Sequence, residues 1–168
     1  MLWNRVMTEE FELYGAPGHL IRRLQQIAVA LFMAETRRFD ITPVQYAALF
    51  SIRAKPGLDQ TALANVIAID RSTIANVVER LEAKKLITRK AGASDRRTKR
   101  LYITPAGRKL LAGVIPAVQS TQDMILAPLK PGERGAFLSM MRRMVAINNS
   151  HSRAPLRINR GEPAGKKP

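Results

Sequence analysis

The chain has 168 residues, of which 46% are hydrophobic and 24% are charged, so it is long enough to bury a core and is not disordered throughout. Its 28 Lys and Arg against 13 Asp and Glu give a formal net charge of +15, which attracts polyanions: nucleic acid or an anionic membrane surface. Cysteine is absent, which excludes disulfides, thiolate metal sites and a cysteine redox sensor.

The N-terminal segment, residues 1–16, carries acidic residues where a secretory signal would have its apolar core. The longest apolar run, Ile27 to Ala34, is much shorter than the ~20 residues needed to cross a bilayer. We therefore predict a cytoplasmic protein with no membrane partner. The first 16 residues are interpreted either as an arm that packs on a partner subunit or as a partly ordered tail.

From about Pro17 to Phe39 the apolar residues recur at helical spacing with no later breaker, which predicts one continuous helix. Its apolar stripe is wide enough to serve its own core and a second chain, so residues 1–41 are assigned to an arm and a first dimerisation helix. A polar patch, His19, Arg22 and Arg23, lies near its start. Because His19 has no second metal ligand nearby in sequence, we predict no metal site. The simpler interpretation of His19 itself is a surface or capping histidine.

The next helix begins with a strong local signal. Thr42 is placed as the N-cap, Pro43 occupies the first turn and Gln45 completes a capping box. The helix is expected to end near Ala54, before Lys-Pro-Gly. Its apolar residues are predicted to build the core, and Tyr46, which carries a hydroxyl on an apolar body, also suits a ligand pocket.

Residues 59–104 are predicted to form a short helix, a turn, a longer helix and a basic two-stranded ribbon. Asp70 is placed to cap the longer helix, because a short carboxylate accepts bonds from the first free backbone N–H groups. One face of this helix is apolar: Ile74, Val77, Val78 and Leu81. The opposite face carries groups that can hydrogen-bond base edges and phosphates in a major groove: Ser72, Thr73, Asn76 and Arg80. An ordinary solvated face is the alternative for this helix alone.

The segment 71–109 is strongly basic, with twelve basic and three acidic side chains for a net charge of +9. This run lies on two alternating apolar segments joined by a polar tip, which is the pattern of a hairpin. A hairpin with arginines at its tip suits gripping phosphates and reaching into a minor groove. We therefore predict a mainly α fold with a winged helix-turn-helix at 42–104, made of about six helices in all and a two-stranded β wing.

Two further helices are expected in residues 105–149. The first begins at Thr104-Pro105, and Pro116 inside it should cause a kink or an interruption. The last ends near Asn148-Asn149. Together with the first helix of the chain they are predicted to form a dimerisation domain, because nothing else covers so many apolar faces. Their methionines either fill gaps in a core or allow an interface to repack. Residues 150–168, with five basic residues and one acid, are predicted to be a disordered basic tail.

Three stretches resemble the signature of the MarR family of bacterial transcriptional regulators: residues 80–89, Asp95-Arg-Arg, and residues 101–107, Leu-Tyr-Ile-Thr-Pro-Ala-Gly. The resemblance extends from about Pro17 to Asn149. It implies a homodimer whose recognition helices enter successive major grooves while the wings enter flanking minor grooves, with Asp95 buttressing the wing. Lys85 stands where the family usually has glycine, so we expect a left-handed backbone there in a non-glycine residue.

The function expected from these features is a ligand-responsive repressor that binds a pseudo-palindromic operator in double-stranded DNA as a homodimer. The predicted DNA-contacting residues are Arg71, Ser72, Thr73, Asn76, Arg80, Arg96, Arg97 and Lys99. A protein that coats DNA without sequence preference is the alternative, and the base-reading groups on the helix argue against it. With two histidines and no catalytic or dinucleotide fingerprint, the chain is not expected to be an enzyme or to need a cofactor.

The resemblance places an inducer pocket between the first two helices and the fifth. The segment Pro17 to Arg23 and the helix at Tyr46 resemble the branch of the family that responds to aromatic acids or their CoA thioesters. Paired arginines suit a carboxylate or phosphate, and two aromatic side chains suit a ring. The predicted ligand residues are His19, Arg22, Arg23, Tyr46 and Phe50. A regulator of efflux or stress genes with a different inducer is the alternative.

Overall fold

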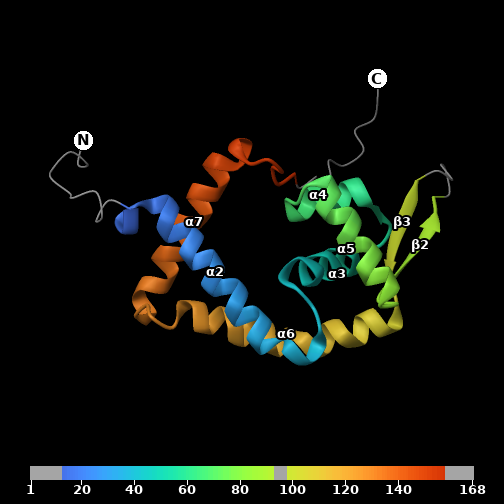
Figure 1. Ribbon diagram of the computed structural model, residues 1–168, viewed down its shortest axis with the longest axis horizontal. Coiled ribbons are helices and arrows are strands. Elements are labelled where there is room, and N and C mark those ends of the chain that lie inside the picture. The colour runs from blue at the N-terminus through green and yellow to red at the C-terminus, as the bar shows by residue number, and fades with distance from the viewer. Residues whose placement is uncertain (1–12, 93–97, 158–168) are drawn as a thin grey trace, which may run out of the picture.

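The computed structural model describes residues 13–92 and 98–157. A winged-helix lobe, residues 42–104, lies beside a scaffold of three long helices, α2, α6 and α7 (Figure 1). The predicted mainly α, winged helix-turn-helix class is confirmed. In chain order the elements are α2 (Pro17–Glu35), η1 (Arg37–Phe39), α3 (Pro43–Ala54), β1 (Leu58–Asp59), α4 (Gln60–Ile67), α5 (Arg71–Ala83), β2 (Ile87–Ala91), β3 (Lys99–Ile103), α6 (Pro105–Leu126), α7 (Pro131–Asn148) and η2 (Asn149–His151).

The first helix does not continue to Phe39, as the sequence predicted, but ends at Glu35. The buried Thr36 hydroxyl donates to the carbonyl of Phe32 at 2.7 Å, and the Thr36 N–H donates to the same carbonyl at 2.9 Å. Such a side-chain bond competes with continuation of the helix. The chain then makes a 3₁₀ turn, closed by Asp40 in the left-handed region at φ 48, which turns it toward α3.

The predicted start of α3 is confirmed. Thr42 Oγ1 accepts from the Gln45 N–H at 3.3 Å, and Gln45 Oε1 accepts from the Thr42 N–H at 3.1 Å, which completes the capping box. The helix buries Leu49 and Ile52 completely and ends at Ala54. This local signal therefore places the first core helix of the lobe in the register that the sequence indicated.

The turn between α4 and α5 and the end of α5 both use left-handed residues that are not glycine. Ala68, after α4, has φ 54, and Lys85, after α5, has φ 57. The expected conformation of Lys85 is therefore confirmed. Its N–H donates to Glu82 O at 2.8 Å, and Leu86 N–H donates to Leu81 O at 2.9 Å, so the last carbonyls of the helix are satisfied as in a Schellman ending.

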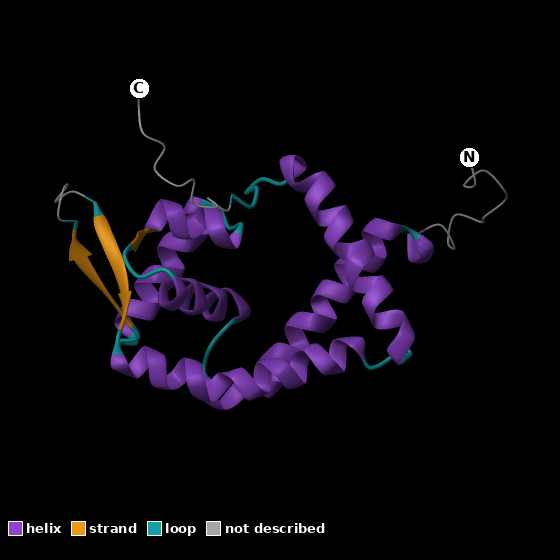
Figure 2. Ribbon diagram, turned by 180° about the vertical axis from the view of Figure 1, so that it is seen from behind, coloured by secondary structure: helices purple, strands orange, loops and turns teal. Residues whose placement is uncertain are grey.

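The sheet has three strands, one more than the predicted wing. The wing strands β2 and β3 pair antiparallel with Ile87 opposite Ile103, and β1 adds to the other edge of β3 with Leu58 opposite Leu101. Figure 2 shows the sheet at the outer edge of the lobe. A strand of two residues has too few side chains to show an alternating pattern, so the sequence did not reveal β1.

Helix α6 passes through Pro116 without the interruption that was considered possible from the sequence. Proline cannot donate to the carbonyl of Ala112, four residues earlier. Both residues are exposed, so water can satisfy that carbonyl. None of the helices in the described ranges has by itself the length and apolar character of a membrane span; Pro105–Leu126 and Pro131–His151 reach it together but are bent by 99°.

The start of the C-terminal tail is ordered, which corrects the prediction of disorder from residue 150. The Asn149 side chain bonds both backbone groups of Leu156, at 2.8 Å and 3.1 Å, and the Arg157 N–H donates to the Asn65 carbonyl at 3.0 Å. That carbonyl is available because Ala68 and Ile69 both direct their N–H groups to Ala64. Residues 158–168 lie outside the described part of the chain.

Candidate nucleic-acid interface

The recognition helix α5 begins at a carboxylate whose two oxygens both accept hydrogen bonds. Asp70 Oδ1 accepts from the Thr73 N–H at 2.9 Å and from the Ser72 hydroxyl at 2.6 Å, and Oδ2 accepts from the Thr73 hydroxyl at 2.8 Å. The Ser72 hydroxyl, followed by the two donors of Thr73, holds the pKa of Asp70 well below its usual range. The predicted helix cap is therefore confirmed, and it carries a negative charge at neutral pH.

This network determines what two of the predicted DNA-contacting side chains offer. A hydroxyl has one proton and two lone pairs, and the protons of Ser72 and Thr73 are both given to Asp70. Toward DNA these hydroxyls therefore present acceptors, which suit the amino groups of adenine or cytosine in the major groove. A phosphate oxygen only accepts hydrogen bonds, so Ser72 can donate to one only if its hydroxyl releases Asp70.

The rest of α5 divides into a buried and an exposed face, as the sequence indicated. Ile74, Val77, Val78 and Leu81 are buried. The five predicted DNA-contacting residues of this helix are all exposed: Arg71, Ser72, Thr73, Asn76 and Arg80. Two guanidinium groups, an amide and two hydroxyls thus lie on the free side of a helix whose other side is fixed in the core.

The wing is tied to the body of the lobe by two arginines of the basic run. Arg89 Nε lies 2.9 Å from Glu82 Oε2, which joins β2 to the end of α5. Arg100 Nη1 donates to Gly57 O at 3.2 Å and lies 3.6 Å from Asp59 Oδ2, which joins β3 to the start of α4. These two guanidinium groups hold the wing in place. Other basic side chains of the run can therefore contact DNA.

The predicted wing contacts are only partly described. Lys99, at the start of β3, is exposed. Asp95, Arg96 and Arg97 lie outside the described residues, so their contact with a minor groove stays a prediction.

A long-range ion pair that sequence reasoning missed holds the other end of α5. Lys84 Nζ lies 2.8 Å from Asp40 Oδ2 and also donates to the Asp40 carbonyl. These residues are 44 positions apart, and no local pattern links them. The pair connects the recognition helix to the turn that follows α2, and so joins the lobe to the scaffold.

The structure divides the predicted ligand residues into two groups. The Tyr46 ring lies between those of Phe32 and Phe50, tilted by 56° and 40°, with both centroid distances at 6.1 Å. His19, Arg22 and Arg23 lie near the start of α2, where His19 meets the Tyr14 ring at 5.5 Å. Thirteen residues of helix separate His19 from Phe32, a rise of ~20 Å. The two groups therefore do not converge on one ligand within a protomer.

Two adjoining cavities lie between the scaffold helices. One, of about 230 Å³, is open to solvent and is bordered by α2, α6 and Pro43 at the start of α3. The other, of about 470 Å³, lies between α2, α6 and α7 and is almost wholly apolar. They share Gln25, Ala28, Gln122 and Ile125. The smaller cavity lies where the resemblance places an inducer, but none of the five predicted ligand residues lines either one.

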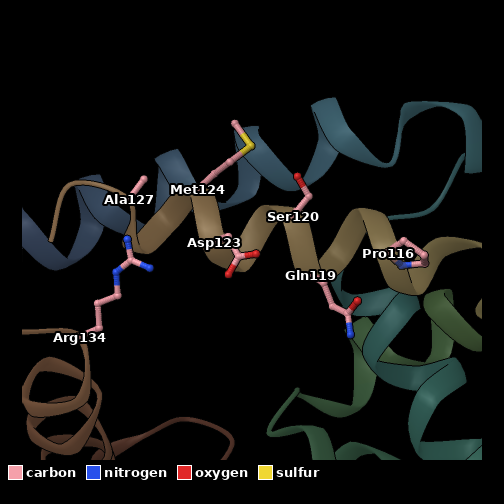
Figure 3. A pocket seen from close by; sticks show the side chains of 7 residues that line it. All are labelled: Pro116, Gln119, Ser120, Asp123, Met124, Ala127 and Arg134. Carbon is pink, nitrogen blue, oxygen red and sulfur yellow. The ribbon is translucent and has the colours of Figure 1, made fainter. Parts of the chain in front are cut away.

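The polar lining of these cavities comes from residues that sequence reasoning did not select. Gln25 and Gln122 contribute amides, and Thr121 contributes a hydroxyl that donates to Ala117 O at 2.9 Å. A glutamine in an amphipathic helix gives no signal that separates a pocket from a surface, which is why it was not found. A third hollow, of about 610 Å³, lies between α6 and Arg134 of α7, with the Asp123 carboxylate exposed in it (Figure 3).

The scaffold exposes large apolar side chains on α2 and α7. Helix α7 has no buried residue, and Ile147 is 71% exposed. A monomer in water rarely leaves such a surface uncovered, so the geometry fits the predicted association with a second copy. Exposed apolar residues on these helices include Leu20, Ile21, Ile27, Met33, Met140, Met141, Met144 and Val145.

Comparison with known proteins points the same way. The MarR family model matches residues 41–99. The HTH-type transcriptional repressor NicR of Pseudomonas putida is 31% identical over 128 residues, 76% of this chain and 81% of NicR. A match of this length extends beyond the lobe into the scaffold.

Two solved structures share the fold over most of the chain. Bordetella bronchiseptica BpsR, whose DNA binding is regulated by 6-hydroxynicotinic acid, has a TM-score of 0.74 at 30% identity, covering 78% of this chain and 94% of BpsR. The transcriptional repressor CouR, solved bound to a 23-mer DNA duplex, has a TM-score of 0.76 at 28% identity, covering 83% of this chain and 99% of CouR. The similarity therefore includes proteins with DNA and with a small aromatic acid as partners.

Proposed function

This chain belongs to the MarR family of transcriptional regulators, and from that premise we propose that it is a repressor that binds a pseudo-palindromic operator as a homodimer and releases it on binding a small aromatic acid. The observation that carries the proposal is α5: its apolar face is locked in the core, and its exposed face presents an ordered set of base-reading groups. We place its action in the cytoplasm, where chromosomal DNA is found, and assign it no catalytic step.

The dimer is supported by the scaffold. One lobe reads a single half-site, and two lobes held at a constant separation read two half-sites about one helical turn apart. The apolar faces of α2 and α7 supply the surface that holds two copies together. Because α6 joins this surface to the wing, a change in the scaffold also changes the spacing of the two recognition helices.

The inducer site is proposed at the smaller cavity. Phe32, Val29 and Ile125 offer an apolar wall for a ring, and the amides of Gln25 and Gln122 can donate to a carboxylate. Pro43, the first residue of α3, forms part of the wall, so a ligand there touches scaffold and lobe together. A tenfold loss of DNA affinity needs a coupling of only ~1.4 kcal/mol between the two sites.

The larger, adjoining cavity matters for whether the inducer is a free aromatic acid or its CoA thioester. An acyl group can extend into it, and its open side leaves a path to solvent for the cofactor part of a thioester. The third hollow carries one carboxylate, Asp123, and one guanidinium, Arg134, so its charges favour neither anion and we do not place the inducer there.

The test is a mobility-shift assay on duplex fragments from upstream of the chain's own gene, with a panel of benzoates, cinnamates, hydroxynicotinates and CoA thioesters. We expect one fragment to be retained and one class of compound to release it. Gln122→Leu should abolish release and leave DNA binding intact, whereas Gln119→Leu, on the same helix but lining neither of the two adjoining cavities, should change neither. Binding that no compound relieves would remove the aromatic inducer; absence of binding to any fragment would remove the operator.

A further inference from the structure

The segment that follows α7 is held in a defined conformation by one side chain. Asn149 acts as a clamp: its Oδ1 accepts from the Leu156 N–H and its Nδ2 donates to the Leu156 carbonyl, at 2.8 Å and 3.1 Å. Inside this loop the Ala154 N–H donates to Ser152 Oγ at 3.2 Å. Residues 150–157 therefore form a closed turn, and we call them the C-terminal strap.

The strap connects the scaffold to the helix-turn-helix. Arg157 donates its N–H to Asn65 in the last turn of α4, at 3.0 Å, and Figure 1 shows the segment after α7 running toward α4. The backbone bond uses a carbonyl that α4 itself leaves unpaired. In a helix-turn-helix the first helix crosses the DNA backbone and the start of the second enters the major groove. The strap thus docks beside the part of the lobe that approaches phosphates.

The strap carries only positive charge. It contains Arg153 and Arg157, both exposed, with His151 and no acidic residue. Arg153 stands in the turn that Asn149 closes, four residues before the bond to Asn65 in α4, and its charge contributes least among the causes that lower the pKa of Asp70 at the start of α5. Within residues 13–92 and 98–157, no acid pairs with Arg153 in a salt bridge, and Asp70 already accepts three hydrogen bonds from Ser72 and Thr73. The guanidinium is thus available to a group outside the protein.

We propose that the C-terminal strap is a third DNA-contacting element, in which Arg153 binds a backbone phosphate next to the major-groove site of α5 and Asn149 positions the strap for that contact. The inference rests on the proposed function, since it requires the lobe to bind duplex DNA. The partner is the phosphate backbone and not a base edge, because the strap bonds to α4, the helix that crosses the DNA backbone in a helix-turn-helix. The contact therefore adds affinity without sequence preference.

The test measures duplex binding by fluorescence anisotropy over a series of salt concentrations, with the full-length chain and two probes. One probe is a random-sequence duplex, and the other is a fragment from upstream of the gene. Arg153→Ala should weaken binding to both probes by a similar factor, roughly three- to tenfold, and lower the salt slope by about 0.9 per protomer. Arg37→Ala, which removes the same charge from the 3₁₀ turn outside the helix-turn-helix, should have a smaller effect on both quantities.

The role of Asn149 is tested by a double-mutant cycle. Asn149→Ala removes no charge, yet it should weaken binding as Arg153→Ala does, and the double variant should bind no more weakly than Arg153→Ala alone. Sedimentation of each variant checks that the oligomeric state is unchanged. Independent, additive effects of the two substitutions, or an Arg153→Ala variant with unaltered affinity and salt slope, would overturn the proposal.

A third result is also decisive. If Arg153→Ala binds both duplexes more tightly, the strap occludes the DNA face and the proposal is wrong. A different result would contradict the proposed function. In that case the unaltered chain would bind the upstream fragment no more tightly than the random duplex. Since the strap contact is measured on the random duplex as well, its outcome does not depend on finding an operator.

Discussion

The lobe and helix α7 of the scaffold use apolar residues in opposite ways. In the lobe, α3, α4, α5 and the sheet bury their apolar side chains against one another, and Leu49, Leu63, Ile74 and Leu81 are completely inaccessible. In the scaffold, α7 has a comparable apolar content and buries no residue. A reading head must keep its shape when it meets DNA, whereas a scaffold that joins two copies must leave its apolar surface available. The difference shows that burial within one chain separates residues that stabilise the lobe from residues reserved for a partner.

The largest effect is expected from shortening a buried side chain in the core of the lobe. Leu81→Ala, at a position with no exposed surface, should lower the free energy of unfolding by about 3 kcal/mol, within the 2–5 kcal/mol typical of such cavities. Denaturant unfolding at fixed protein concentration measures it. Exposed Ala83→Gly, on the same helix, should cost only about 1 kcal/mol. Equal losses would mean that the core of the lobe is not packed as described.

A substitution on the exposed apolar face of α7 should weaken dimerisation and leave the folding of the chain unchanged. Met144 on α7 is 49% exposed in the single chain. Met144→Glu would place a charge in the dimer interface and should weaken self-association by about 2 kcal/mol or more. Analytical ultracentrifugation gives the dimer constant, and circular dichroism should show an intact helical content. Ser139→Glu adds the same charge to the same helix about 140° around its axis and should leave the dimer intact. Dissociation by both variants would point to net charge as the cause.

The junction of the two regions allows little space. A Cβ at Gly107, in the first turn of α6, would lie 2.2 Å from the carbonyl oxygen of Leu86 and 2.8 Å from Ile103 Cγ1. Gly107→Ala should therefore separate α6 from the end of α5 and destabilise the protein by about 1–3 kcal/mol.

A glycine in open space provides the control for that substitution. A Cβ at Gly135 in α7 would meet nothing within 4 Å, so Gly135→Ala should stabilise the helix by about 0.5–1 kcal/mol. Thermal unfolding of both variants compares the two positions. A harmless Gly107→Ala would show that α6 is not seated tightly against the lobe.

The smallest expected effect is the pH dependence of the helix cap. The pKa of Asp70 is lower in the folded chain than its ordinary value of 3.8, so its stabilisation is fully present above that pH and is lost as the pH falls through the folded value. Asp70→Asn keeps a capping oxygen and removes the titration. Stability curves of the two proteins should run parallel above pH 5 and converge on acidification; parallel curves throughout would show that Asp70 is not held ionised by Ser72 and Thr73.

Local signals in the sequence located most of the lobe correctly. The capping box at Thr42 and Gln45 and the Asp70 cap each depend on atoms within a few residues, so the residue types alone were sufficient, whereas the left-handed Lys85 was expected from the family resemblance. The reading face of α5 was found for the same reason, since helical spacing assigns the buried and exposed sides. The ligand residues were harder, because a cavity is formed by side chains from three helices and no single helix records it.

By itself, the sequence determined the helix starts, the amphipathic faces, the basic ribbon and the class of partner, because these follow from short-range hydrogen bonds, periodicity and net charge. Only the tertiary structure decided that β1 joins β3, that Lys84 reaches Asp40, that His19 and Tyr46 lie apart, and that the strap returns to α4. Each of these depends on which distant segments meet. That choice is made by the packing of the whole core, and it has no counterpart in the order of neighbouring residues.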